Sequence, residues 1–205
     1  MGLKEGLKKF WNLIWKDDSW KGWIISIIVL FIFIKFIFFP TLSLVTGTAL
    51  PMAIVESCSM YHEENVLPNY KGWWESHKAK YSDLTINREE FTRFIFHNGF
   101  NKGDILFVIK ANPEKLKIGD VIIFNGGKQN PLVHRIIKIE NKNNEYFFST
   151  IGDNNNGQLE IEKEIKQEQL VGKAIFKIAP YMGWAKLIFY EYLKNPSERG
   201  MCKQN

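Results

Sequence analysis

The sequence predicts a mainly β protein: a small β-barrel or sandwich domain outside the membrane, with one N-terminal transmembrane helix and a small, partly helical insertion. Two observations lead to this prediction. An apolar run over residues 22–39 is long enough to cross a bilayer. Beyond residue 103, five short segments rich in β-branched and aromatic residues follow one another with turns, and no helical pattern, between them. With 45% hydrophobic residues among 205, the chain is too apolar to be disordered and long enough to form a core.

The N-terminal part is a basic flank followed by an apolar span. Residues 1–21 are predicted to form a cytosolic amphipathic flank, whose tryptophans suit the headgroup region. The span, residues 22–39, contains one charge, Lys35, and extends roughly 27 Å as a helix against a hydrocarbon thickness of ~30 Å. Five lysines precede it, whereas residues 40–57 contain no Lys or Arg, so the positive-inside rule places the N-terminus in the cytosol. A cleaved signal peptide and a buried core helix are the alternative interpretations.

The net charge of +5 is concentrated near the N-terminus. Residues 1–35 carry six lysines and three acidic residues, which leaves a net charge of +2 on the remaining 170 residues. Because these residues are nearly balanced in charge, they offer little electrostatic attraction for nucleic acid. We expect no nucleic-acid partner.

The two cysteines, Cys58 and Cys202, are too few for a disulfide framework and show none of the paired spacings of zinc sites. We interpret Cys58 as a buried, apolar thiol, and the redox compartment stays open. The spacing of histidines and acidic residues likewise suggests no metal site. We expect neither a metal nor an organic cofactor.

The β domain is predicted to consist of residues 40–60 and 99–180. After a short connector, MAIVE at 52–56 has the apolar, β-branched character of a strand. The Asn-rich sequence at 141–144 is typical of a hairpin turn. The other predicted strands are DILFVIK at 104–110, DVIIF at 120–124, LVHRIIKIE at 132–140, EYFFSTI at 145–151 and GKAIFKI at 172–178.

Two segments lie outside this strand pattern. Residues 61–98 are polar and aromatic and form an inserted subdomain, in which Asn87 caps an amphipathic helix predicted over 87–97. Its aromatic residues either pack together or contact membrane or substrate. Residues 181–205 are predicted to form a helix and a tail. Because the apolar stretch 181–194 is short for a second span, that helix is either interfacial or packed on the core.

Three residues combine a reactive group with a suitable backbone position. Ser59 follows the strand at 52–56, at a strand-to-turn transition that would expose it. His134 lies within the strand at 132–140 and is the one histidine on the predicted β scaffold. Asp153 follows a strand and enters a Gly/Asn turn, where it can cap the turn or orient an imidazole. Taken singly, each also has a structural interpretation, as a turn serine, a half-buried strand histidine and a turn cap.

Five sequence boxes, taken in order, strengthen the catalytic interpretation. PMAIVESCSM, GFNKGDILFVIK, KIGDVIIF, VHRI and IGDNN resemble those of signal peptidase I of the archaeal and endoplasmic-reticulum type. The resemblance covers residues 51–60 and about 99–180, and the N-terminal span agrees with the anchor of that family. It implies a membrane-anchored serine endopeptidase that cleaves N-terminal signal peptides, with small residues at the first and third positions before the cut.

The resemblance also assigns roles to residues. It implies that Ser59 is the nucleophile, His134 its general base and Asp153 the acidic partner, while the hydroxyl of Ser57 helps to bind the oxyanion. Because a tetrahedral oxyanion needs more than one donor, the backbone N–H of Ser59 is the second candidate. Archaeal members usually have a second Asp about six residues after the first. Leu159 stands there in this chain and Glu160 follows, which makes Glu160 the candidate second acid.

The same strand that leads to the nucleophile is a candidate substrate-binding strand. If it is an edge strand, it could pair with an extended peptide and place small side chains in shallow pockets. The residues concerned are Met52, Ala53, Ile54, Val55 and Glu56.

The expected partners are signal peptides of secretory preproteins, the lipid bilayer and the protein translocation channel. The expected location is the plasma membrane, in a single-pass topology with the catalytic domain on the outer face, or the endoplasmic-reticulum membrane in a eukaryote. Two alternatives stay open: another serine peptidase of related fold, and a catalytically silent, membrane-tethered β domain that binds secretory partners through residues 61–99.

Overall fold

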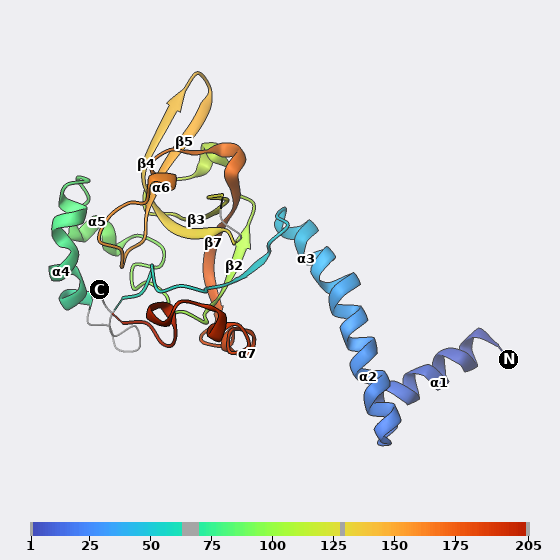
Figure 1. Cartoon of the computed structure of the whole chain (residues 1–205). Helices are drawn as coiled ribbons and strands as arrows, with labels where there is room; N and C mark the ends of the chain where they lie inside the picture. The colour runs from blue at the N-terminus through green and yellow to red at the C-terminus, as the bar shows by residue number, and fades with distance from the viewer. Residues whose placement is uncertain (1, 63–69, 128–129, 204–205) are drawn as a thin grey trace. The chain divides into compact units, whose positions relative to one another are not determined.

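The computed structural model describes residues 2–62, 70–127 and 130–203, and the chain divides into two compact units, Met1–Thr46 and Gly47–Asn205 (Figure 1). The first unit is helical, and the second is built on one β-sheet. The predicted fold class, mainly β with an apolar N-terminal helix, is confirmed.

The helical unit contains a short helix, α1 (Leu3–Trp15), and one long apolar helix, Trp20–Thr46. The long helix consists of α2 (Trp20–Phe33), a π-helical turn, η1 (Ile34–Phe38), and α3 (Phe39–Thr46). Its mean hydropathy reaches 2.6, and most of its large apolar side chains are exposed. By length and composition it is a candidate membrane span.

This helix continues past Pro40, although the sequence indicates an end there and a connector beyond it. Proline lacks the N–H that donates to the carbonyl four residues earlier, and its ring crowds that carbonyl. The π-helical turn Ile34–Phe38 lies directly before this position and widens the backbone. The helix therefore accommodates the proline and ends at Thr46.

The second unit is a seven-stranded antiparallel sheet in the order β1-β2-β7-β3-β4-β5-β6. The five strands predicted beyond residue 103 are all present, within two residues of their predicted bounds. Asn143 and Asn144 have left-handed backbone in the β4–β5 hairpin, as the turn sequence predicts. The strands are β1 (Met52–Ile54), β2 (Ile105–Ile109), β3 (Val121–Phe124), β4 (Leu132–Lys142), β5 (Glu145–Ile151), β6 (Ile165–Lys166) and β7 (Leu170–Ala179), and the short connecting helices are η2 (Pro113–Lys115), α6 (Glu160–Lys163) and η3 (Gln167–Gln169).

Strand β3 is buried on both faces. Val121 and Ile123 pack with residues of β1, β2 and β7, whereas Ile122 and Phe124 pack with residues of β4, β5 and β6. Two hydrophobic cores thus meet at one strand. Since β4 pairs with β3 over residues 132–135, the backbone around His134 is held against the strand at which the two cores meet.

In the described part of the insertion, residues 61–62 and 70–98, there are two helices, α4 (Tyr70–Ser82) and α5 (Arg88–Thr92). Its aromatic side chains pack against one another instead of facing solvent. The buried members of this aromatic cluster are Trp73, Trp74, Tyr81, Ile86 and Phe91, and Leu84 and Phe94 pack against them.

Helix α5 begins where the sequence predicts and ends earlier. The Asn87 side chain accepts a hydrogen bond from the N–H of Glu90 at 2.9 Å, which is the predicted cap. The predicted helix over 87–97 stops at Thr92, because the carbonyls of Ile95 and Phe96 turn toward the guanidinium of a buried arginine on β4.

The C-terminal helix expected over 181–194 is broken into α7 (Trp184–Leu187) and η4 (Glu191–Leu193), followed by η5 (Pro196–Glu198). Contacts with the loop before β2 fix the start of α7. The N–H of Gly183 donates to Gly103 O at 2.8 Å, and the Trp184 indole donates to Lys102 O at 3.0 Å.

Cys58 is bonded to Cys202, so its interpretation as a free, buried thiol is wrong. The C-terminal tail returns to the turn after β1 and brings the two Cα atoms to 5.3 Å, within the usual range for a disulfide. The 144 residues between them hid this proximity from the sequence.

Replacing Phe91 by Ala is expected to lower the free energy of unfolding by about 3–5 kcal/mol, because it empties a fully buried position in the aromatic cluster. Phe189, which is 69% exposed, is the matched control, and Phe189→Ala should change the same quantity by less than about 0.5 kcal/mol. Urea unfolding of the chain in detergent measures both. Similar losses for the two variants would contradict the packing described above.

Candidate active site

The candidate site is built around a contact between Ser59 and His134. Ser59 lies in the turn after β1, and His134 lies in β4 opposite Ile122 of β3. The Ser59 Oγ and His134 Nε2 atoms are 2.9 Å apart, and the exposed Ser57 places its Oγ 3.2 Å from that of Ser59. His134 is buried and Ser59 is half-buried, so the serine hydroxyl is the accessible end of the pair.

The other ring nitrogen of His134 contacts Glu162, which is fully buried. Because a carboxylate group accepts hydrogen bonds, we assign the hydrogen to Nδ1, which donates a hydrogen bond to Glu162 Oε1. Nε2 is then an acceptor for the hydroxyl of Ser59. The ring is therefore held in the tautomer that a base for serine requires.

Glu162 was not anticipated from the sequence. Its Oε2 accepts the N–H of Leu159 at 2.7 Å, and its Oε1 lies 3.3 Å from the Thr150 hydroxyl. Glu160, the candidate second acid, is 86% exposed and pairs with Lys163 at 2.6 Å, away from the histidine. One signal could have identified Glu162: a glutamate three residues into a helix turns its side chain back toward the residue that caps it.

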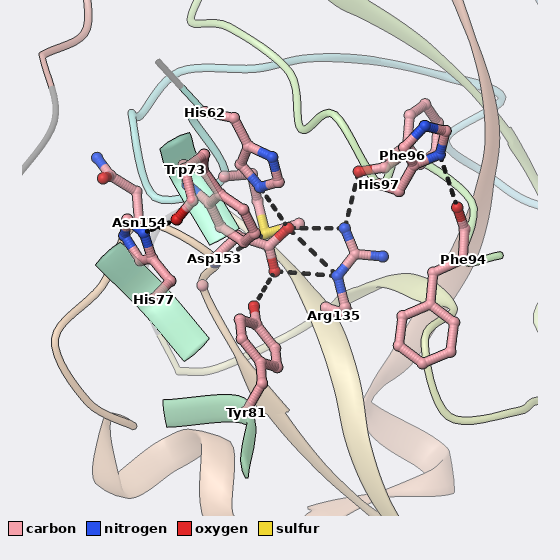
Figure 2. Close-up of polar contacts among 12 residues, drawn as sticks. His62, Trp73, His77, Tyr81, Phe94, Phe96, His97, Arg135, Asp153 and Asn154 are labelled. Atoms are coloured by element: carbon pink, nitrogen blue, oxygen red, sulfur yellow. Dashed lines mark hydrogen bonds and ion pairs between the residues drawn. The ribbon is translucent and has the colours of Figure 1, made fainter. Parts of the chain in front are cut away.

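Asp153 lies in a different environment, shown in Figure 2. It forms an ion pair with Arg135, with 2.6 Å between Arg135 Nη2 and Asp153 Oδ2, and both side chains are fully buried. The Tyr81 hydroxyl donates to Oδ1 at 2.8 Å, and His62 Nε2 lies 2.9 Å from Oδ2. The resemblance assigns Asp153 to His134, but among the described residues the imidazole it contacts is that of His62.

Strand geometry explains why the two acids are divided in this way. His134 and Arg135 are consecutive on β4 and point to opposite faces of the sheet. Arg135 pairs with Ile151 of β5, and Asp153 follows two residues later, on the same side as Arg135. An acid for His134 must approach from the other face, as Glu162 does.

Burial and the ion pair determine the charges in this second environment. Burial lowers the pKa of His62 to about 4, and its hydrogen bond to Asp153 offsets only part of that effect. Burial by itself raises the pKa of Asp153, but the Arg135 guanidinium and the hydrogen bond from His62 hold it well below its usual range. At neutral pH, Asp153 is therefore ionised, and a neutral His62 donates its Nε2–H to the carboxylate.

The Gly-Asp-Asn-Asn turn supports Ser59 through its backbone. The Asn154 N–H donates to Ser59 O at 2.8 Å, and its side-chain amide donates to Cys58 O at 3.1 Å. A Cβ on Gly152 would lie 2.8 Å from Ser59 O, so this close approach requires glycine. The turn thus positions the serine and does not supply the acid that contacts His134.

Strand β1 is an edge strand in the sheet order. Val55 forms backbone hydrogen bonds, at 2.8 and 2.9 Å, with the residues that lead into β2. Because backbone groups alternate along a strand, those of Met52 and Ile54 point away from β2. The carbonyl of Glu56 accepts a hydrogen bond from Lys194 Nζ at 2.7 Å, which closes one end of this edge.

The structure thus brings together Ser57, Ser59 and His134, and places Asp153 and Glu160 away from the imidazole of His134. Across residues 2–62, 70–127 and 130–203, no group of three or more His, Cys, Asp or Glu side chains is arranged to hold a metal ion.

Comparison with known proteins identifies homologues of this chain. Signal peptidase complex catalytic subunit SEC11C of Homo sapiens, and likewise of Canis lupus familiaris, is 31% identical over 102 residues, which cover 46% of this chain and 53% of the relative. The SEC11 subunit of Colletotrichum graminicola is 29% identical over 99 residues, covering 45% and 58%. The chain spans about half the length of the curated relatives it matches, and no family model matches it. The resemblance seen in the sequence boxes is confirmed by these homologues.

The free energy of unfolding is expected to fall by up to ~3 kcal/mol as the pH decreases from about 6.5 to about 4, because unfolded His62 takes up a proton that folded His62 does not. In His62→Gln, which retains a neutral donor toward Asp153, this contribution to the slope should disappear. Urea unfolding at several pH values above about pH 5, where unfolded carboxylates are still largely ionised, isolates the histidine. Equal slopes in the two proteins would refute the assignment.

Proposed function

We propose that this chain is a membrane-anchored serine endopeptidase that cleaves N-terminal signal peptides from exported preproteins. The observation that carries this proposal is the chain of contacts from the Ser59 hydroxyl through His134 to the buried Glu162. A serine, a histidine and an acidic residue in this order are the groups that activate a serine for acyl transfer. The names of the homologues, which are catalytic subunits of signal peptidase complexes, supply the substrate class.

In the proposed reaction, His134 Nε2 removes the proton of the Ser59 hydroxyl as its oxygen attacks the scissile carbonyl. The imidazole becomes an imidazolium, which the carboxylate of Glu162 stabilises at Nδ1. His134 then returns the proton to the leaving amine, and water releases the acyl group by the same route. Glu162 takes the orienting role that the resemblance gives to Asp153.

The tetrahedral intermediate needs donors for its oxyanion. We assign this role to the Ser59 backbone N–H and the Ser57 hydroxyl, because Ser57 Oγ lies 3.2 Å from the attacking oxygen and is exposed toward the site. Where one such donor has been removed from other serine proteases, the cost is roughly 3–4 kcal/mol in the barrier.

Strand β1 is the proposed substrate-binding strand. Its edge position and the direction of the Met52 and Ile54 backbone groups suit pairing with an extended peptide. The Lys194 contact at Glu56 limits this pairing to a short stretch just before the nucleophile. A short, extended cleavage segment with small side chains fits such an edge better than a folded loop.

The proposed location is a membrane, with the helix Trp20–Thr46 as the anchor and the unit beginning at Gly47 on the outer face. The Cys58–Cys202 disulfide supports this topology, because disulfides persist in oxidising compartments and are rare in the cytosol. The protein translocation channel is a candidate partner, since signal peptides emerge there.

The C-terminal segment has the composition of an interfacial surface. Leu187 is buried, whereas Ile188, Phe189 and Leu193 are 65–69% exposed and share the segment with two exposed tyrosines. Large apolar side chains seldom face water in such a group, and tyrosines favour the headgroup region. We propose that this segment rests on the bilayer surface.

Ser59→Ala and His134→Ala should each lower kcat/KM for a membrane-inserted preprotein by about 10³-fold or more. Glu162→Gln removes the acceptor charge at His134 Nδ1 and should lower kcat by about 10²–10⁴-fold. Glu160→Gln is the matched control, two residues away and exposed, and should stay within about twofold of the parent. Full activity of Ser59→Ala, or equal activities of the two glutamate variants, would refute the assignment.

Topology can be measured with a membrane-impermeant maleimide on single introduced cysteines, because the disulfide leaves no native thiol to react. Lys138→Cys, at a residue whose side chain is 62% exposed on β4, should be labelled in intact cells. Lys4→Cys, before the span, should be labelled only after permeabilisation. The opposite pattern would place the β unit in the cytosol.

A further inference from the structure

The Cys58–Cys202 disulfide attaches the C-terminal tail to the residue directly before the candidate nucleophile. Both cysteines are partly exposed, and neither takes part in the reaction proposed above. Because this bond is next to Ser59, it restricts where the Ser59 side chain can lie, in addition to stabilising the fold.

Ser59 depends on local ties for its position. His134 is fixed within β4, but Ser59 lies in a turn beyond the end of β1, outside the sheet ladder. Asn154 holds the Ser59 and Cys58 carbonyls at 2.8 and 3.1 Å, and its side-chain amide also donates to Lys203 O of the tail at 3.2 Å. The disulfide is the covalent tie between this turn and the tail.

The tail is a firm support for that tie. The buried ammonium of Lys102 donates to Glu191 Oε2 and to the carbonyl of Glu198, both at 2.7 Å. The N–H of Gly200 also donates to Glu191 Oε2, at 2.9 Å. Cys202 therefore follows a segment that is anchored on the body of the β unit, and the disulfide transmits this anchorage to Cys58.

We propose that the Cys58–Cys202 disulfide positions Ser59 for attack, so that the peptidase reaches full activity only when this pair is oxidised. The inference rests on the proposed function. The Ser59 Oγ must stay within hydrogen-bond reach of His134 Nε2, now 2.9 Å away, and a displacement of about 1 Å can cost on the order of 10²-fold in rate.

The redox step is a thiol–disulfide exchange. The Cys58 and Cys202 thiols lose two protons and two electrons to an external disulfide, which is reduced to two thiols as the new S–S bond forms. An external dithiol reverses the step. Since cytosolic thiols are kept reduced, newly made chains would hold Ser59 loosely until the β unit reaches an oxidising compartment.

The test compares the oxidised full chain with the same protein treated with dithiothreitol, using a preprotein substrate in detergent. Reduction should lower kcat by about tenfold or more and leave KM within about threefold, because the tie acts on the nucleophile and not on substrate binding. Reoxidation should restore kcat. Cys202→Ser and the double variant Cys58→Ser/Cys202→Ser should show the low kcat under all conditions, and Met201→Ser, an exposed neighbour in the tail, should behave like the parent.

Near-ultraviolet circular dichroism at the assay temperature gives the folded fraction of each protein. A kcat within twofold of the oxidised parent after reduction, or a loss that only follows the folded fraction, would overturn the inference. These outcomes differ from failure of the proposed function itself, in which Ser59→Ala would retain activity. If Ser59→Ala is inactive and reduction leaves kcat unchanged, the peptidase assignment stands and the positioning role of the disulfide is wrong.

Discussion

The buried ion pair between Arg135 and Asp153 is the interaction on which the rest of the β unit depends. Burying two opposite charges costs several kcal/mol per ion, which is recovered only when the remaining hydrogen-bonding groups also find partners. Here they do: the carboxylate accepts from Tyr81 and His62, and the guanidinium donates to the carbonyls of Ile95, Phe96 and Gly119. Four of these partners belong to the insertion, and the fifth, Gly119, lies in the turn before β3. The insertion is therefore required by the charges of the β unit and is not an independent addition.

The same ion pair is linked by neighbouring residues to both members of the contact between Ser59 and His134. Arg135 follows His134 in the chain, and Asp153 precedes Asn154, whose N–H holds the carbonyl of Ser59. Arg135 is thus the neighbour of His134 in the chain, and Asp153 is the neighbour of the residue that holds Ser59. The ring centroid of Phe91, in the aromatic cluster of the insertion, lies 4.9 Å from the guanidinium carbon of Arg135. This packing keeps water from the ion pair and so strengthens the attraction between its charges. Packing in the insertion supports the geometry of the site through this contact.

Much of the fold could be predicted from the sequence, because strands of alternating pattern and an apolar helix are local signals. The proximity of Ser59 and His134 could be inferred only from a resemblance, since 75 residues separate them. The contact of His134 with Glu162, rather than with Asp153 or Glu160, was not anticipated for a physical reason: which face of β4 an acid reaches depends on the β4–β5 register, and the register is a tertiary property. The bond between Cys58 and Cys202 was also not anticipated, because the course of the tail depends on tertiary contacts such as that between Lys102 and Glu191.

Strand β1 has a further consequence for how the molecule meets other proteins. An open sheet edge invites pairing with any other exposed strand, including the same edge of a second copy, and long, flat edges lead to aggregation. β1 has three residues, and Lys194 occupies the carbonyl of Glu56 just beyond it. An edge this short can hold one extended peptide through a few hydrogen bonds, but it offers too little ladder for two protein molecules to join. The edge therefore suits short-lived pairing with one peptide segment and gives little support to stable self-association.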